Sequence, residues 1–319
     1  MGAVPAPLSP SGAHDVREEE TAMWLRVLGA GAGGGFPQWN CGCPGCRAVR
    51  DGSRPATPRT QSSIAVSADR RTWFLVNASP DLRAQIDADQ DLHPRTGRDS
   101  PIAAVLLTDA ELDHTMGLLL LREGPGIALH ATDASFETLR DGTGFLPTLE
   151  RYTQVERHRV VPGATVALHE HLSYRAFDVP TVKKARFGGV EDEGRVVGYR
   201  FTDTASGRTA VYLPGVQEIT PAVHEELAGA DVVLVDGTTW TDDEMITMGL
   251  ASKTARDMGH LAVGGPGGSL AVLADLPAER RIYVHINNTN PMLLEDTPEH
   301  AEVIARGVEI APDGLEVEV

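Results

Sequence analysis

Short runs of apolar residues, most of them bounded by Gly, Pro, Asp or Asn, recur along the chain and predict β-strands. They are WLRVLGAG (24–31), SSIAVSA (62–68), TWFLVNA (72–78), IAAVLLT (102–108), ALHAT (128–132), TAVYLP (209–214), DVVLVDG (231–237) and RIYVHIN (281–287). Amphipathic or apolar stretches predict helices at 80–88, 115–123, 219–229, 269–279 and 297–306, the last of which Gly307 is placed to cap. Early strands are consecutive and later ones alternate with helices, which favours two sheets covered by helices, a layered α/β arrangement in one domain.

The start of the chain differs in composition from the rest. Residues 1–22 are rich in Ala, Pro, Ser and Glu, and such segments bury too little apolar surface to fold. We therefore expect a disordered N-terminal extension over 1–22 and a domain over 23–319. A domain of this length can bury a substantial core.

Composition and charge exclude several classes of protein. Hydrophobic residues make up 41% of the chain, as in globular proteins. No apolar run approaches the roughly 18 residues that cross a membrane, and no signal peptide with a basic start is present. The net charge is −17 without a basic stripe, so binding to nucleic-acid phosphates is not expected. We expect a cytoplasmic protein that binds neither nucleic acid nor membranes.

A run of glycines follows the first predicted strand and imitates a dinucleotide-binding loop: Gly29, Gly31, Gly33, Gly34 and Gly35. Such a loop should open directly into a helix. Here it continues as FPQWNCGCPGC (36–46), which cannot start a helix cleanly. A tight turn that lets the backbone approach a site is the favoured interpretation.

All three cysteines, Cys41, Cys43 and Cys46, lie within six residues. Thiols spaced in this way by small turn formers can converge on one Zn²⁺, which prefers sulfur ligands in a tetrahedron. The alternative is a set of free thiols. Three thiolates plus one further protein ligand leave no open position, so the predicted site is structural.

Acidic residues and a histidine gather just past the predicted strand 102–108, in LLTDAELDHTMGLLLL. These residues are Asp109, Glu111, Asp113 and His114. Charges at the end of an apolar strand favour a functional site, and the alternative is a salt-bridged strand end. His285, in the last long strand, and His260, in a glycine-rich loop, are each more often structural unless the fold brings them to this cluster.

The same stretch resembles the metallo-β-lactamase superfamily signature Thr-His-x-His-x-Asp-His. Asp109 and Glu111 stand at the two leading histidine positions, while Asp113 and His114 are retained. Longer blocks are similar to the B-protein family of pyrroloquinoline quinone (PQQ) biosynthesis, from about Met23 to the C-terminus. They are LGAGAGGGFPQWNCGCPGC, PRTQSSIAVS, LVNASPDLRAQI, LLTDAELDHTMGLLLLREG, VDGTTWTDDEM, DMGHLAVGG and HINNTNPMLLEDTPEHA. The resemblance implies the αββα four-layer sandwich with metal at one edge.

The resemblance also implies which metal ligands are missing. A complete site of the superfamily holds two metals, and the first uses the two leading histidines, a histidine after the strand ending near Phe177, and a carboxylate after TAVYL. This chain has FDVPTV and Pro214-Gly215 at the last two places. The second site survives as Asp113, His114 and His285. Two histidines and one carboxylate with open positions are the set used by non-haem Fe(II) oxygenases.

The expected function is therefore Fe(II)- and O₂-dependent hydroxylation of the tyrosine ring of a Glu–Tyr cross-linked, peptide-derived PQQ precursor. One alternative is a non-enzymatic carrier that helps to move PQQ or its precursor to the periplasm. Another is a zinc hydrolase, which the loss of the leading histidines disfavours. Zinc in place of iron after aerobic purification and association with other PQQ biosynthesis proteins are further expectations.

Further residues are expected around the metal ligands and at the cysteine site. His260 is expected to face the substrate and transfer a proton. Asp109 and Glu111 are candidates for acid–base groups, a weak second metal site or partners of the ligands, and Asp236 and Glu244 are weaker candidates. Asn288 stands where a phosphonate-pathway relative has the histidine that completes its cysteine site. Because an amide is a far poorer zinc ligand than a histidine, the Asn288 oxygen, a water or another group is expected to be the fourth ligand. From their side-chain chemistry, we also expect Arg59, Gln61 and Ser62 to line the pocket. Arg59 could pair with a carboxylate of the substrate.

Overall fold

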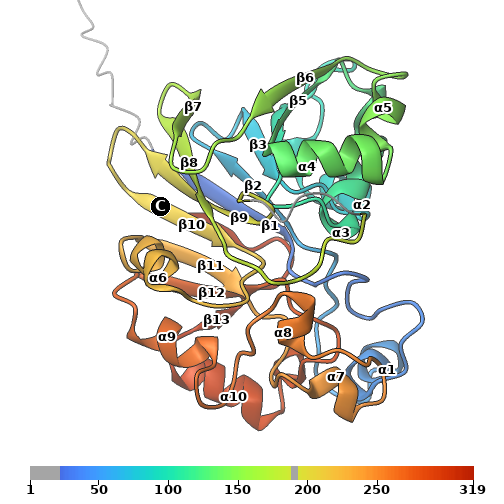
Figure 1. The fold of residues 1–319 in the computed structure, drawn as a ribbon, viewed down its shortest axis with the longest axis vertical. Helices are drawn as coiled ribbons and strands as arrows, with labels where there is room; N and C mark the ends of the chain where they lie inside the picture. Colours follow the sequence, from blue (N-terminus) through green and yellow to red (C-terminus); the bar gives the residue numbers. More distant parts are fainter. Residues whose placement is uncertain (1–21, 188–192) are drawn as a thin grey trace, which may run out of the picture.

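The computed structural model describes residues 22–187 and 193–319, and in this part of the chain two seven-stranded sheets pack face to face (Figure 1). The first sheet has the order β14-β1-β2-β3-β4-β5-β6. Its strands are β1 (Trp24–Gly29), β2 (Ser63–Ser67), β3 (Trp73–Val76), β4 (Ile102–Leu106), β5 (Ile127–Ala131), β6 (Val155–Arg159) and β14 (Glu316–Glu318).

The second sheet has the order β13-β12-β11-β10-β9-β8-β7. Its strands are β7 (Thr165–His169), β8 (Leu172–Asp178), β9 (Val197–Asp203), β10 (Thr209–Leu213), β11 (Val232–Asp236), β12 (Arg280–Val284) and β13 (Glu309–Ile310). All five residues of the central strand β11 are buried, because both of its faces are covered.

Helices lie on the outer face of each sheet (Figure 1). The first half contributes α1 (Pro44–Asp51), α2 (Leu82–Ala88), η1 (Gln90–Leu92), α3 (Leu112–Thr115), η2 (Met116–Glu123), α4 (Asp133–Glu137), η3 (Thr138–Gly142) and α5 (Phe145–Leu149). The second half contributes α6 (Pro221–Ala228), α7 (Glu244–Thr247), α8 (Ala255–Met258), α9 (Ser269–Asp275), η4 (Pro291–Leu293) and α10 (Pro298–Ala305). None of these described helices has the length and apolarity needed to cross a bilayer.

Three apolar clusters separate the layers. One lies between the two sheets and includes Val27 and Leu234. The second lies between the second sheet and α6, α9 and α10, and includes Leu227. The third lies between the first sheet and α2, η2 and α5, and includes Leu82. The αββα four-layer sandwich expected from the resemblance is confirmed.

Parallel strands set the position of the candidate site. β3 to β6 are parallel to one another, and so are β10 to β13. The carboxyl ends of β4 and β12 meet across the sandwich, because His285 follows β12 and contacts Asp113, which follows β4. Ligands of α/β sheets bind at such carboxyl ends.

The eight predicted strands are all present, with ends one to three residues shorter than the apolar runs or shifted by one. The predicted helix 115–123 is wrong in type, since α3 ends at Thr115 and η2 continues as a 3₁₀ helix. Gly117, at the start of η2, packs directly against the backbone of Ser79. A Cβ added to Gly117 would stand 2.2 Å from the Ser79 carbonyl oxygen. The extension predicted over 1–22 lies outside the described residues except for residue 22.

Sequence reasoning missed the strands β6 to β9, β13 and β14 and the helices α1, α4, α5, α7 and α8. The strand β6 (VERHR) is a half-exposed edge strand with one aliphatic residue, so it gives no apolar signal. The helix α1 begins at Pro44, directly after Cys43, whose sulfur accepts a hydrogen bond from the Cys46 amide at 3.4 Å. The cysteine segment thus does start a helix, contrary to the expectation, although the glycine run before it does not.

Candidate metal centre and cavity

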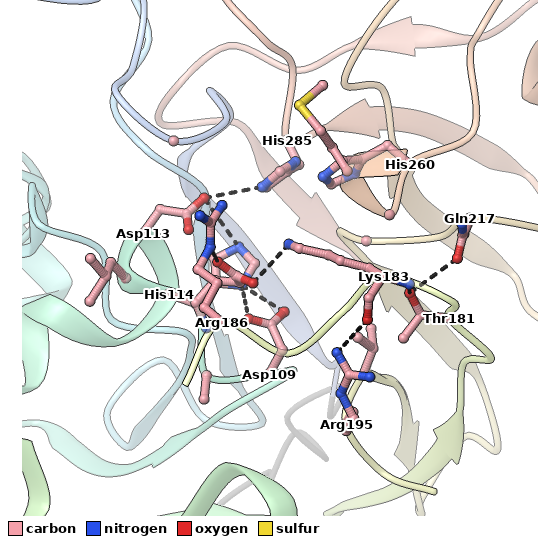
Figure 2. A pocket seen from close by; sticks show the side chains of 18 of the residues that line it. Asp109, Asp113, His114, Thr181, Lys183, Arg186, Arg195, Gln217, His260 and His285 are labelled. Atoms are coloured by element: carbon pink, nitrogen blue, oxygen red, sulfur yellow. Dashed lines mark hydrogen bonds and ion pairs between the residues drawn. The ribbon is translucent and has the colours of Figure 1, made fainter. Parts of the chain in front are cut away.

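A cavity of about 380 Å³ opens at the carboxyl ends of the parallel strands. Asp113, His114 and His285 lie on one side of it, and His260 lies beside His285 (Figure 2). The glycine run forms the expected tight turn at its edge, with left-handed backbone at Gly34 and Gly35. A Cβ on Gly33 would stand 3.1 Å from Asp113 Oδ2.

Asp113, His114 and His285 offer ligand atoms that all lie within 4.8 Å of one another. Asp113 Oδ2 is 3.4 Å from His285 Nε2 and 4.0 Å from His114 Nε2. Among the described residues His114 Nε2 has no hydrogen-bond partner although it is buried. A buried polar atom without a partner is costly, and a metal ion at this point would satisfy it. The residues therefore fit a mononuclear metal.

Asp109 holds His114 from behind. Its two carboxylate oxygens lie 2.9 and 2.8 Å from His114 Nδ1. A carboxylate in this position fixes the ring and leaves Nε2 free for a metal, as is usual for metal-binding histidines. Burial disfavours charge on both groups, but their attraction outweighs it, lowering the pKa of Asp109 to about 2 and raising the pKa of His114.

His285 is held in the same way from the second sheet. Its Nδ1 lies 3.0 Å from Thr238 Oγ1 and 3.8 Å from Asp236 Oδ1. Burial opposes protonation, yet hydrogen bonds with Asp113 and Asp236 raise the pKa of His285 to about 10. The His285 backbone has a φ of 53°, a left-handed conformation that is rare outside glycine and concentrates at functional sites.

Asp236, His260 and His285 form a second group whose ligand atoms converge. The Asp236 carboxylate is already occupied, because it accepts hydrogen bonds from the Val216 and Thr238 amides at 3.1 and 2.9 Å and lies 2.6 Å from His260 Nδ1. This arrangement suits a positioning carboxylate better than a ligand. His260 stacks on His285 with ring centroids 5.1 Å apart. With Nδ1 engaged, Nε2 is the His260 nitrogen available to a molecule in the cavity.

Glu111 points away from the ligand atoms. Its two oxygens lie 2.7 Å from Lys183 Nζ and 3.0 Å from Arg186 Nε. Among the described residues, Asp109 and Glu111 belong to no convergent group of metal ligands. Of the three roles left open by the sequence, the geometry favours a partner of a ligand for Asp109 and an ion-pair partner for Glu111.

The residues guessed from side-chain chemistry lie elsewhere, so the expectation that they line the cavity is wrong. Arg59 is buried and donates to the Ala311 and Thr57 carbonyl oxygens, so it cannot pair with a substrate. Gln61 donates to Asp81, and Ser62 hydrogen-bonds Tyr212. The weaker candidate Glu244 is buried and accepts from the Trp240 amide.

The three cysteine sulfurs converge in a buried cluster. Asn288 lies opposite them, with Nδ2 at 3.1, 3.6 and 3.3 Å from Cys41, Cys43 and Cys46 Sγ. Burial, together with the Cys43 sulfur, raises the pKa of Cys46 to about 12 in spite of a hydrogen bond from the Gln38 amide. Three buried sulfurs fit Zn²⁺, whose charge would stabilise the thiolates. Asn288 Nδ2 donates to the sulfurs, so Asn288 would have to turn its Oδ1 towards the ion to act as a fourth ligand.

The sequence analysis missed the wall of the cavity that follows β8. This wall is formed by Thr181, Lys183, Arg186 and Arg195, with Gln217 beside them (Figure 2). One signal was available, since the chain has three lysines, and Lys183 and Lys184 are two of them. Thr238, which contacts both His260 and His285, gave no signal because an isolated threonine has no motif.

Two sheets packed face to face, with convergent histidines and carboxylates at the carboxyl ends of their parallel strands, define a member of the β-lactamase superfamily. Residues 72–286 match the family model described as "Beta-lactamase superfamily domain". More narrowly, the chain belongs to the coenzyme PQQ synthesis protein B family. It is 45% identical over 310 residues to "Coenzyme PQQ synthesis protein B" of Cupriavidus necator, covering 92% of this chain and 98% of that one.

Other relatives support the same assignment. A Pseudomonas aeruginosa protein of that name is 43% identical over 313 residues, with 93% of this chain and 100% of the relative covered. The crystal structure of Zn²⁺-bound PqqB from Methylobacterium extorquens is 42% identical, with a TM-score of 0.86, and covers 93% of this chain and 100% of that one. The expectation of this family is therefore confirmed.

Proposed function

We propose that the protein hydroxylates the tyrosine ring of the Glu–Tyr cross-linked precursor in PQQ biosynthesis, using Fe(II) and O₂. The observation that carries the proposal is the mononuclear ligand set of Asp113, His114 and His285 at the edge of a cavity. Two histidines and one carboxylate leave open positions on a metal, the arrangement of non-haem Fe(II) oxygenases. When bound there, Fe(II) supplies the activation of O₂.

The zinc in the M. extorquens relative does not identify the working metal of this chain. Nitrogen and oxygen ligands bind Zn²⁺ more tightly than Fe²⁺, so zinc replaces iron wherever it is available. We propose Fe(II) at the active site and a structural Zn²⁺ at Cys41, Cys43 and Cys46, with Asn288 as the fourth group.

The side chains around the cavity have separate tasks in this proposal. Asp109 and Thr238 fix the orientation of the two histidines, so that the Nε2 atoms face the metal position. His260 accepts a proton from the substrate at Nε2, because Asp236 occupies Nδ1. In each hydroxylation a ring C–H becomes C–OH. The other oxygen atom of O₂ leaves as water, with two protons and two electrons from a small reductant, which is ascorbate in the assay below.

An O₂-uptake experiment separates this function from its rivals. Anaerobically purified protein is loaded with Fe(II) and mixed with precursor, ascorbate and O₂, and mass spectrometry follows the precursor. We expect substrate-dependent O₂ uptake and mass increases of one oxygen atom, and neither with Zn²⁺-loaded protein. Tight precursor binding without turnover would instead support the carrier, and turnover by hydrolysis with Zn²⁺ would support the hydrolase. The cytoplasmic location and the association with other PQQ biosynthesis proteins stay predictions.

A further inference from the structure

Two cations share one carboxylate at the wall of the cavity. Lys183 and Arg186 both pair with Glu111, at 2.7 and 3.0 Å, so among the described residues two cations share one carboxylate. Nearby, the Arg195 guanidinium donates to the Lys183 carbonyl oxygen at 2.6 Å. No carboxylate of the described residues lies within ion-pair distance of Arg195. In a chain of net charge −17, a cavity wall whose described residues carry more positive than negative charge indicates an anionic ligand.

The backbone that carries Lys183 is held in place. Gln217 accepts from the Val182 amide at 2.8 Å and from the Thr181 hydroxyl at 3.1 Å. A Cβ on Gly259 would stand 3.1 Å from Lys183 Cδ, so the lysine stem packs against that glycine. The ammonium is therefore delivered into the cavity from a fixed point rather than from a free surface side chain, and its side chain is 21% exposed.

Glu111 is held with similar precision on the other side. Its amide donates to Asp109 Oδ1 at 2.9 Å, and its carbonyl oxygen accepts from the His114 amide at 3.1 Å. Glu111 lines the same cavity as the metal ligands, and its carboxylate turns away from them towards Lys183 and Arg186. In Figure 2 the Lys183 and Arg186 side chains reach toward the side of the cavity where Asp113 and His114 lie.

We propose that Lys183 and Arg186 form a binding subsite for a carboxylate group of the ligand, and that Glu111 occupies this subsite while the cavity is empty. The incoming carboxylate replaces the internal one, so the two cations are never left without a partner. A lysine suits such an exchange, because its ammonium is a compact charge on a flexible stem that can re-pair without a fixed fork geometry. The proposed function enters only as the source of the natural ligand, a peptide-derived acid.

Binding without turnover tests this subsite separately from hydroxylation. The probes are N-acetyl-L-glutamyl-L-tyrosine, which has two carboxylates, and the matching diamide, N-acetyl-L-glutaminyl-L-tyrosinamide. Calorimetry on the Zn²⁺-loaded protein measures the dissociation constant of each. We expect the wild type to prefer the diacid, and Lys183→Met to weaken diacid binding about tenfold while leaving the diamide unchanged, since tenfold corresponds to one charged hydrogen bond. Lys183→Arg should keep most of the preference.

Glu111→Gln gives the opposite and sharper result. Removing the internal competitor should tighten diacid binding about threefold to tenfold, the scale of two partly exposed ion pairs, and leave the diamide unaffected. The matched control is Glu279→Gln, which removes a carboxylate paired with Arg208 at 2.6 Å, at the end of β12 opposite to His285. This control should change neither constant.

Three results would overturn the proposal. Weaker or unchanged diacid binding in Glu111→Gln, with unaltered zinc content and circular dichroism, would show that the ion pairs of Glu111 with Lys183 and Arg186 only stabilise the fold. Equal tightening in Glu279→Gln would assign the effect to net charge. An undiminished diacid preference in Lys183→Met and Arg186→Met would place the carboxylate elsewhere, for example on the metal. All three outcomes are independent of whether the loaded enzyme hydroxylates anything.

Discussion

Asp109 and His285 contribute to the same metal position in different ways, and their substitution should separate these roles. His285 offers a ligand atom, whereas Asp109 only orients His114. We expect His285→Ala to abolish Fe(II) binding and hydroxylation. Asp109→Ala should weaken Fe(II) affinity about 10- to 100-fold, as removal of a partner behind a metal ligand does. Anaerobic titration with Fe(II) against a chelating indicator measures both constants.

Full iron content and turnover in His285→Ala would contradict the proposed ligand set. Two metals at the cavity of the wild type, one of which is lost in Asp109→Ala, would instead restore the two-metal interpretation. Asp109→Asn is a useful companion, since an amide can hold the histidine ring without charge. It should fall between the wild type and the alanine variant.

The low pKa of His130 should make the free energy of unfolding depend on pH, independently of the metal site. Burial, with repulsion from the stacked His158, lowers the pKa of His130 to about 4, below the usual value near 6.5. The unfolded chain therefore binds more protons than the folded chain between these values, and the free energy of unfolding falls as the pH falls from 6.5 towards 4. Urea unfolding at several pH values should show a shallower fall in His130→Gln. The exposed-histidine control His224→Gln should follow the wild type, and an unchanged slope in His130→Gln would contradict the assignment.

Among single residues, those that belong to a sequence motif could be predicted. Those that are distant in the sequence and meet only in the folded chain were missed. Asp113 and His114 are adjacent, so their pairing was visible, and His285 came with the family resemblance. Lys183 and Thr238 lie far from them in the chain, and their contacts depend on the β8–β9 connection and on the turn after β11. The error at Arg59 has the same cause, because nothing in the sequence says that its guanidinium is taken by backbone carbonyls.

Among the elements, the segment from the end of β12 to η4 serves two sites. It carries His285 at the cavity and Asn288 at the cysteine cluster, three positions apart. The sequence predicted the strand before it, since RIYVHIN is apolar and flanked by turn residues. The conformation of the segment could not be predicted, because left-handed backbone at a histidine is set by tertiary contacts rather than by propensity.

The cysteine cluster gives a prediction for this segment. Cys43→Ser should lose zinc, because one of three thiolates is removed. Asn288→His should bind zinc more tightly, since an imidazole is a far better ligand than an amide. Competition with a zinc chelator, followed by elemental analysis, measures both variants. A zinc content per chain that is unchanged in Cys43→Ser would exclude zinc binding at the cysteines.

Across the whole molecule, the negative net charge repels the proposed anionic ligand at long range, whereas the cations of the cavity wall attract it at short range. A net charge of −17 repels an anion, while the cavity wall attracts it. Salt screens the distant charges most, with a screening length of about 10 Å at 0.1 M. We therefore expect the association rate of N-acetyl-L-glutamyl-L-tyrosine to rise between low and moderate salt, while its dissociation rate also rises. Stopped-flow tyrosine fluorescence tests this, and a falling association rate would contradict it.

The segment shared by the two sites also has a consequence for assembly of the holoprotein in the cell. On the proposed metal assignment, zinc at the cysteines would fix the strand end that carries His285, so the iron ligands would be complete only after zinc has bound. Loading would then be sequential, and a cell short of zinc would accumulate a chain that cannot retain iron even when iron is plentiful. Activity would follow the supply of a metal that takes no part in the chemistry.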